Sequence, residues 1–302
     1  MEMNLSKAAQ HYGSIIELTL QKVKYSLRGR FSHANEQQIL AKYIEELLPA
    51  NHPKTVVDIG AGNGVRRSNS YALLLAGWKA LGIEADAKKH ALLSRAYRKF
   101  PNARAIHSRV DPNNVASLFR DFDIEKNFGV LCLDIDGNDY WVLDAILANF
   151  RPGLVVTEIN ENIPPPLRFV VKFDPAFQLR YHFYGYSIAA LEDLCQKHDY
   201  GILGLEYNNA FLAPDEIGAL RFRDAESAYR TGYLDRNDRK ERFASNLDME
   251  IIHSLSSEKG IGFLHEFYVN DEGNFWLASD RESFAEKLCP EPVETQPLIR
   301  NG

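Results

Sequence analysis

Cysteine is scarce in this chain, with 3 among 302 residues, and the three lie far apart at Cys132, Cys195 and Cys289. Such a set is neither a disulfide framework nor a zinc signature, so we expect a reducing compartment. The first residues contain no apolar signal region. The longest apolar stretch, 71–83, is interrupted by a glycine and a lysine and is too short to span a bilayer. These absences predict a cytoplasmic protein with no membrane partner.

An excess of basic residues is also lacking. The chain has 35 Lys and Arg against 41 Asp and Glu, which gives a formal net charge of −6. A general nucleic-acid binder would usually be basic, so no nucleic-acid partner is expected, although a local basic patch is not excluded. Hydrophobic residues at 45% and charged residues at 25% are typical of a globular chain that buries a sizeable core.

Several catalytic signatures are missing as well. The sequence has no Gly-x-Ser-x-Gly elbow and no Walker A phosphate loop, and its 9 histidines show no metal-type clustering. The remaining candidates for a functional site are the acidic and glycine-rich positions.

Five short β-branched or apolar runs alternate with helical segments in the middle of the chain. The runs are 55–59, 80–84, 103–107, 128–134 and 154–158, with helices predicted at 70–76, 87–100, 113–119 and 140–149. This rhythm is typical of βαβ units and predicts a parallel sheet covered on both faces. A helix at 187–198 and strands at 201–206 and 210–213 would complete it. We expect an α/β fold with a doubly wound, seven-stranded, mainly parallel sheet.

The two ends of the chain carry additions to this core. Residues 5–48 read as helical, so 1–52 is interpreted as a helical N-terminal extension and 53–215 as the core. Residues 216–302 are interpreted as a helical and hairpin C-terminal extension. Its hairpin is predicted from two apolar runs, 263–269 and 274–278, that flank the turn Asn270-Asp-Glu-Gly273.

The sharpest local signal is Val56-Val-Asp-Ile-Gly-Ala-Gly-Asn-Gly64, an apolar strand that ends in an acid and continues into glycines. Glycines allow a close approach of the backbone to a ligand, and a following helix would present free N–H groups. A dinucleotide fingerprint needs its third glycine one place later, where Val65 stands. The spacing after Asp58 favours a nucleoside ligand with a cationic amino-acid end, and a ligand-free turn is the alternative.

Acidic residues follow three further strands. Glu84 ends the second strand, where two carboxylate oxygens can accept both hydroxyls of a ribose. Asp134 and Asp136 follow the fourth strand, and Glu158 and Asn160 lie at the end of the fifth. These groups predict either a Mg²⁺ site made by Asp134, Glu158 and Asn160 or a general base among the aspartates.

Two nearby residues have competing explanations. His182 lies in Arg180-Tyr-His-Phe-Tyr-Gly185 and could act as a base near neutral pH, but a histidine among aromatic residues is more often a packing residue. Asp139 is explained by capping of the helix that follows it. Asp134 is not explained in that way, because it ends an apolar strand. We therefore expect a buried Asp134 with a cationic or donor partner.

Three motifs together resemble class I S-adenosylmethionine-dependent methyltransferases: Asp58-Ile-Gly-Ala-Gly-Asn-Gly64, Gly77-Trp-Lys-Ala-Leu-Gly-Ile-Glu84 and Asp134-Ile-Asp-Gly-Asn-Asp139. They are most similar to FkbM-like enzymes, which mostly O-methylate natural products or sugars. The resemblance covers residues 55–215 and implies a Rossmann-like methyltransferase fold with S-adenosylmethionine as cofactor. The cofactor-binding residues that it implies are Asp58, Gly60, Gly62, Asn63, Glu84, Arg109, Val110 and Asp134.

The hypothesis is therefore an O-methyltransferase that acts on a small-molecule or glycosyl acceptor. Asp134, Asp136 or His182 would act as the base, or Mg²⁺ would assist the loss of the acceptor's proton. Two alternatives stay open. One is an NAD-dependent oxidoreductase, which Val65 disfavours, and the other is a non-catalytic nucleoside-binding scaffold, which the strand-end acids disfavour. The acceptor and the formation of a homodimer are left open.

Overall fold

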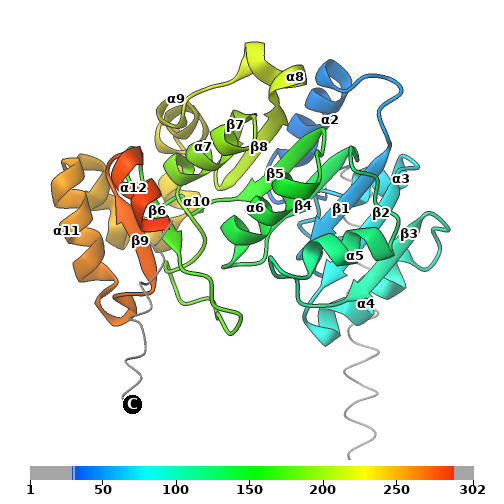
Figure 1. Ribbon diagram of the computed structural model, residues 1–302, viewed down its shortest axis with the longest axis horizontal. Coiled ribbons are helices and arrows are strands. Elements are labelled where there is room, and N and C mark those ends of the chain that lie inside the picture. The colour runs from blue at the N-terminus through cyan, green and yellow to red at the C-terminus, as the bar shows by residue number, and fades with distance from the viewer. Residues whose placement is uncertain (1–28, 30, 289–302) are drawn as a thin grey trace, which may run out of the picture.

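A computed structural model describes residue 29 and residues 31–288 of the chain (Figure 1). Most of the predicted helical segment 5–48, and residues 289–302 of the predicted C-terminal extension, lie outside the described residues. Among the described residues, no helix has both the length and the apolar composition that a membrane span requires.

A seven-stranded sheet forms the centre of the molecule, with the strand order β3-β2-β1-β4-β5-β8-β7 (Figure 1). Its strands are β1 Thr55–Ile59, β2 Lys79–Glu84, β3 Ala103–His107, β4 Val130–Leu133, β5 Leu154–Glu158, β7 Tyr200–Glu206 and β8 Asn209–Pro214. Strands β1 to β5 pair in parallel, and β8 runs antiparallel to both of its neighbours. The predicted mainly parallel seven-stranded sheet is confirmed, and its strand order reverses between β1 and β4.

Helices cover both faces of this sheet. One face carries α5 Val115–Asp121, α6 Asp139–Asn149 and α7 Ile188–Lys197. The other carries α2 Glu36–Leu47, α3 Tyr71–Leu75 and α4 Ala87–Tyr97. Because successive strand residues point to opposite faces, Val56 and Val57 are both fully buried, each against a different set of helices.

The predicted hairpin at 263–278 is wrong. Its first half belongs to helix α11, Ser257–Phe267, which begins after the capping residue Ser256. Its second half, β9 Phe275–Ala278, pairs antiparallel with an unpredicted strand, β6 Arg168–Val171. The partner of β9 lies far back along the chain, so no local turn could reveal the pairing.

A second, smaller core lies beside the main sheet. It is built from the β6–β9 pair, α11 and the 3-10 segment η3, Ala244–Ser254, and it contains Phe169 and Phe275 (Figure 1). The C-terminal extension that was predicted to be partly helical does form short helices, and α12 closes the described chain. Their bounds are α8 Asp215–Gly218, η1 Ala219–Arg221, α9 Ala225–Tyr229, η2 Arg230–Leu234, α10 Arg239–Arg242, η4 Val269–Asp271 and α12 Arg281–Leu288.

One ion pair with a buried guanidinium joins two of the short helices. The Arg239 side chain is 7% exposed and donates from Nη1 and Nη2 to the two carboxylate oxygens of Glu250, at 2.7 and 2.8 Å. These bonds lower the pKa of Glu250 from 4.5 to about 2. Because the folded pKa lies below the ordinary value, the pair stabilises the fold fully above pH 4.5 and loses this contribution as the pH falls towards 2.

We expect Glu250→Gln to lower the free energy of unfolding at neutral pH by about 2–3 kcal/mol, because it leaves a buried guanidinium without its counter-charge. Its stability should also depend less on pH than that of the wild type between 4.5 and 2. Urea unfolding followed by circular dichroism measures both effects. The control is Glu266→Gln, at an exposed position of α11. Equal acid sensitivity of wild type and Glu250→Gln would contradict the assignment.

Candidate functional site

Two glycines of the loop after β1 are required for different reasons. Gly60 has a φ of +83°, and a Cβ at this position would lie 1.7 Å from the carbonyl oxygen of Asp134. The close contact between the ends of β1 and β4 therefore requires Gly60. Gly62 has a φ of +56°, but a Cβ there would meet nothing within 4 Å. Of the two positions, only Gly62 leaves open space for a ligand.

The loop is not followed directly by a helix, so the expected row of free helix N–H groups is absent at this position. Helix α3 begins only at Tyr71. The side-chain oxygen of Asn63 accepts hydrogen bonds from the backbone N–H groups of Val65 and Arg66, at 3.0 and 2.8 Å. Two backbone N–H groups that follow the glycines, which were expected to bind a ligand, are thus already hydrogen-bonded to the Asn63 side chain.

The acids at the ends of β1 and β2 have separate roles in this loop. Asp58 is buried, and loss of water raises its pKa to about 6, while its carboxylate accepts a hydrogen bond from the Ser70 hydroxyl. Glu84 accepts the Gly62 N–H with one carboxylate oxygen and the Asp86 N–H with the other, at 2.8 and 2.7 Å. Each oxygen of Glu84 has a second lone pair for a further donor.

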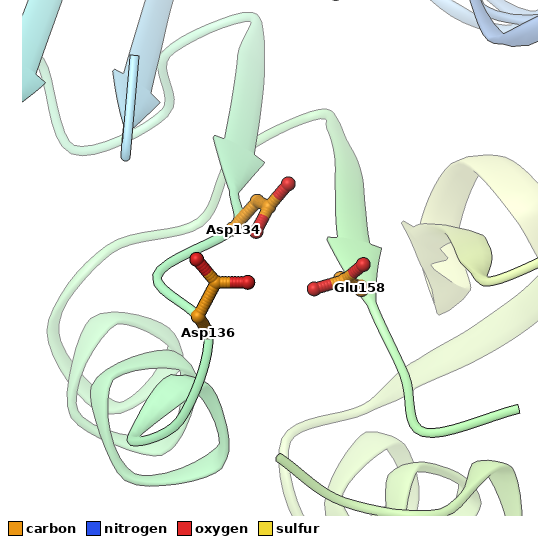
Figure 2. A group of neighbouring side chains, drawn as sticks. All are labelled: Asp134, Asp136 and Glu158. Carbon is orange, nitrogen blue, oxygen red and sulfur yellow. The ribbon is translucent and has the colours of Figure 1, made fainter. Parts of the chain in front are cut away.

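Three carboxylates meet between the tips of β4 and β5 (Figure 2). Oxygens of Asp134, Asp136 and Glu158 lie within 4.8 Å of one another. The prediction that Asp134 is buried is wrong, because β4 ends at Leu133 and the Asp134 side chain is exposed at the floor of a cavity. Its charge therefore meets solvent on one side and protein on the others.

This proximity changes the protonation of the group. Enclosure by protein, followed by the charges of Asp139 and Asp136, raises the pKa of Asp134, which is hydrogen-bonded to Glu158. Burial and the Asp134 charge raise the pKa of Glu158 well above its ordinary value. Because the two carboxylates cannot both ionise freely at this distance, each holds a proton more readily than a free carboxyl group does.

Two residues outside the predicted set hold the carboxylates in place. Asp139 accepts the backbone N–H groups of Ile135 and Gly137, at 2.7 and 2.8 Å, so it shapes the turn before α6 rather than capping the helix as predicted. Asn208 donates from Nδ2 to Glu158 at 2.5 Å. Asn208 was not among the predicted site residues. Its only signal was a position in the short turn between two predicted strands.

Two adjoining cavities of about 510 and 340 Å³ lie above these residues and share Gly60, Arg67, Lys89 and Asp134 along their walls. They form one cleft at the carboxyl ends of the central strands, where an open parallel sheet binds its ligands. The predicted site residues that line the cleft are Asp58, Gly60, Gly62, Asn63, Glu84, Arg109, Val110, Asp134, Asp136 and Glu158.

His182 and Asn160 do not line either cavity. His182 is 4% exposed, and its Nε2 lies 3.0 Å from a carboxylate oxygen of Asp248, so it is a buried packing residue rather than the base. Asn160 is fully buried and donates to the carbonyl oxygens of His182 and Tyr184, at 2.8 and 3.1 Å. Asn160 is therefore not available as a metal ligand, and Asp136 takes its place beside Asp134 and Glu158.

The sequence matches no known family profile and no curated protein. Solved structures do match it. A TehB-like S-adenosylmethionine-dependent methyltransferase from Corynebacterium glutamicum is 11% identical, with 69% of this chain and 98% of that chain covered at a TM-score of 0.40.

An S-adenosylmethionine-dependent methyltransferase from Clostridium acetobutylicum is 12% identical, with 67% and 98% covered at a TM-score of 0.38. The N-terminal domain of EvdMO1, solved in the presence of SAH and D-fucose, is 12% identical, with 60% and 83% covered at 0.39. At these scores the function of this chain has to be argued from its own site.

The two glycines predict different outcomes on substitution. Gly60→Ala should destabilise the fold by about 3 kcal/mol or more, because its Cβ overlaps a backbone carbonyl that cannot move aside. Gly62→Ala should cost only about 1 kcal/mol, the strain of its positive φ. Thermal unfolding of both variants tests the difference. Equal destabilisation would show that the β1–β4 contact is not the tight constraint described here.

Proposed function

We propose that this chain is an S-adenosylmethionine-dependent methyltransferase that transfers a methyl group to a hydroxyl of a small-molecule or glycosyl acceptor. The main support for this proposal is the position of the Glu84 carboxylate. It receives the Gly62 N–H at 2.8 Å and faces the same cavity as Asp134. One side chain therefore shapes the glycine loop and presents acceptor oxygens to a ligand diol.

The chemistry of the cleft fits this cofactor. When bound, S-adenosylmethionine supplies an electrophilic methyl group on a positively charged sulfur. Glu84 would accept its ribose hydroxyls, and the acids at the cleft floor, Asp58 and Asp134, would face its positive groups. Ile83 and Val110 line the same cavity and offer apolar contacts to a flat adenine ring. The donor and acceptor set is thus that of a cationic nucleoside site.

The proposed reaction also needs a base, and Asp134 and Glu158 are the candidates for it. An alcohol is too weak an acid to lose its proton unaided near neutral pH, so methyl transfer to oxygen needs a base. In the Asp134–Glu158 pair, one member carries a proton and the other is an anion that can accept a proton from the acceptor. Asn208 and Asp139 keep this pair and the neighbouring turn in position.

A divalent cation is the second candidate for the same carboxylates. The oxygens of Asp134, Asp136 and Glu158 lie within 4.8 Å of one another, which suits a hard cation with oxygen ligands. Such an ion would favour the ionised acids and take over the activation of the acceptor hydroxyl. The two candidates differ in their response to a chelator.

Loss of Glu84 tests cofactor binding. We expect Glu84→Gln to weaken the binding of S-adenosylhomocysteine about 10- to 100-fold, because it removes charged hydrogen bonds worth about 1.5–3 kcal/mol. Isothermal titration calorimetry gives the affinities. Asp121→Asn, at an exposed position of α5, serves as a control with the same charge change. Unchanged affinity in a folded Glu84→Gln variant would remove Glu84 from the site, and preferential binding of NADH would refute the proposal.

Loss of Asp134 tests the chemistry. We expect Asp134→Asn to reduce methyl transfer from labelled S-adenosylmethionine to a panel of hydroxylated sugars and phenols by about 100-fold or more, the usual effect of losing a general base. Circular dichroism checks folding. Addition of EDTA to the wild type should leave the rate unchanged. Loss of activity with EDTA and recovery with Mg²⁺ would favour the cation, and near-normal activity of Asp134→Asn would overturn both candidates.

A further inference from the structure

Basic residues concentrate in one segment of an otherwise acidic protein. Residues 60–110 contain ten Lys and Arg but only two Asp and Glu, a surplus of eight positive charges, whereas the whole chain has a net charge of −6. This segment includes the glycine loop, β2 and α4, which contribute residues to the cleft wall, and residues 108–110 after β3, which do so as well. The segment therefore carries a positive charge that the chain as a whole lacks.

Four of these cations line the cleft itself. Arg67 and Lys89 border both cavities, Arg66 borders the smaller one and Arg109 the larger one, and all four side chains are exposed. Across residues 31–288, no carboxylate lies within 4 Å of any of these four cationic groups. Arg109 donates instead to the carbonyl oxygen of Pro175 at 2.6 Å, so its charge is not neutralised.

The backbone at Arg67 supports a role for this rim. Arg67 has a φ of +56°, a left-handed conformation that a residue with a side chain adopts only at a cost. The residue lies where the two cavities join. A glycine would relieve the strain but would leave this junction without its guanidinium.

The proposed cofactor does not account for four cations. S-adenosylmethionine carries one carboxylate, but its ammonium and sulfonium groups make it positively charged overall. The acids at the floor, Glu84, Asp134 and Glu158, suit such a ligand, whereas a basic rim repels it. The rim therefore fits a second ligand of negative charge. Arginine binds phosphate or carboxylate through two parallel hydrogen bonds, and a charged cleft attracts such ligands from solution.

We propose that the methyl acceptor is an anion: a hydroxylated small molecule with a phosphate or carboxylate group that Arg66, Arg67 and Lys89 bind at the rim of the cleft. This inference rests on the proposed function, because it assigns the rim to the acceptor. The anionic group would be held at the rim while the hydroxyl reaches the Asp134–Glu158 pair at the floor.

The first experiment measures ligand charge. Protein saturated with S-adenosylhomocysteine is titrated by calorimetry with a hexose phosphate, a hexuronate and the neutral hexose. We expect at least one anionic sugar to bind about tenfold or more tightly than the hexose, and to bind less tightly as salt is added. The stronger of the two anions identifies the group as phosphate or carboxylate. Equal binding of all three sugars would overturn the inference.

The second experiment compares two double variants of equal charge change. Arg66→Gln with Arg67→Gln removes two rim cations. Arg98→Gln with Lys99→Gln removes two exposed cations just after α4, which lie outside both cavities. Arg98 lies nine residues after the rim residue Lys89, about 14 Å further along the helix. We expect the rim variant to lose about tenfold or more of the affinity for the anion and the control variant to stay within about twofold.

Affinity for S-adenosylhomocysteine separates the remaining outcomes. We expect it to stay within about threefold of wild type in both double variants. A large loss in the rim variant alone would assign the arginines to the cofactor and overturn the inference. Equal loss of anion binding in both variants, or tighter binding of single-stranded RNA than of either sugar anion, would also overturn it. If the wild type binds no S-adenosylhomocysteine, the proposed function fails, and titration of the unloaded protein still tests the rim for anions.

Discussion

The contact between the ends of β1 and β4 is the constraint on which the site depends. A side chain at residue 60 would overlap the carbonyl oxygen of Asp134. The loop after β1 therefore packs against the end of β4 so closely that only a glycine fits at this position. The strand order reverses between these two strands, and crossovers therefore leave the sheet towards opposite faces. A cleft opens where the two strands end, with Asp134 at its floor.

Close packing at the floor has an electrostatic cost that a hydrogen bond from Asn208 partly offsets. Asp134, Asp136 and Glu158 repel one another when ionised, and this repulsion adds to the effect of burial in raising the pKa values of Asp134 and Glu158. Asp139 satisfies two backbone N–H groups of the adjoining turn, and Asn208 donates to Glu158. The raised pKa values mean that this group of acids holds a proton more readily than free carboxyl groups do.

Local patterns predicted the central sheet well because its strands are short, apolar and separated by helices. Thr55–Ile59 and Leu154–Glu158 are found with the predicted bounds. Long-range pairing was not predictable, since β6 and β9 come together only through the tertiary fold and the turn at 270–273 suggested a false partner. The apolar run at 263–267 was also misleading. It was predicted to be a strand, but it forms part of a helix that packs against the second core.

The site was predictable wherever position along a strand determines which edge a residue occupies. That rule placed Asp58, Glu84 and Asp134 at one edge, and all three line the cleft. It could not say which way a side chain turns after the strand has ended. Asn160 turns into the protein to bond two carbonyl groups, whereas Asp136 turns towards Asp134.

The two charge layers of the cleft follow from different elements of the sequence. The acids stand at strand ends, where the sheet fixes their depth, and the cations Arg66, Arg67 and Lys89 stand on the loop and helix above them. Because the floor is partly screened from water and the rim is open to it, the acids act over short distances and the rim acts at longer range. Such a cleft can hold a positively charged ligand below and an anion above. Attraction between two such ligands would then help to hold them next to each other in the cleft.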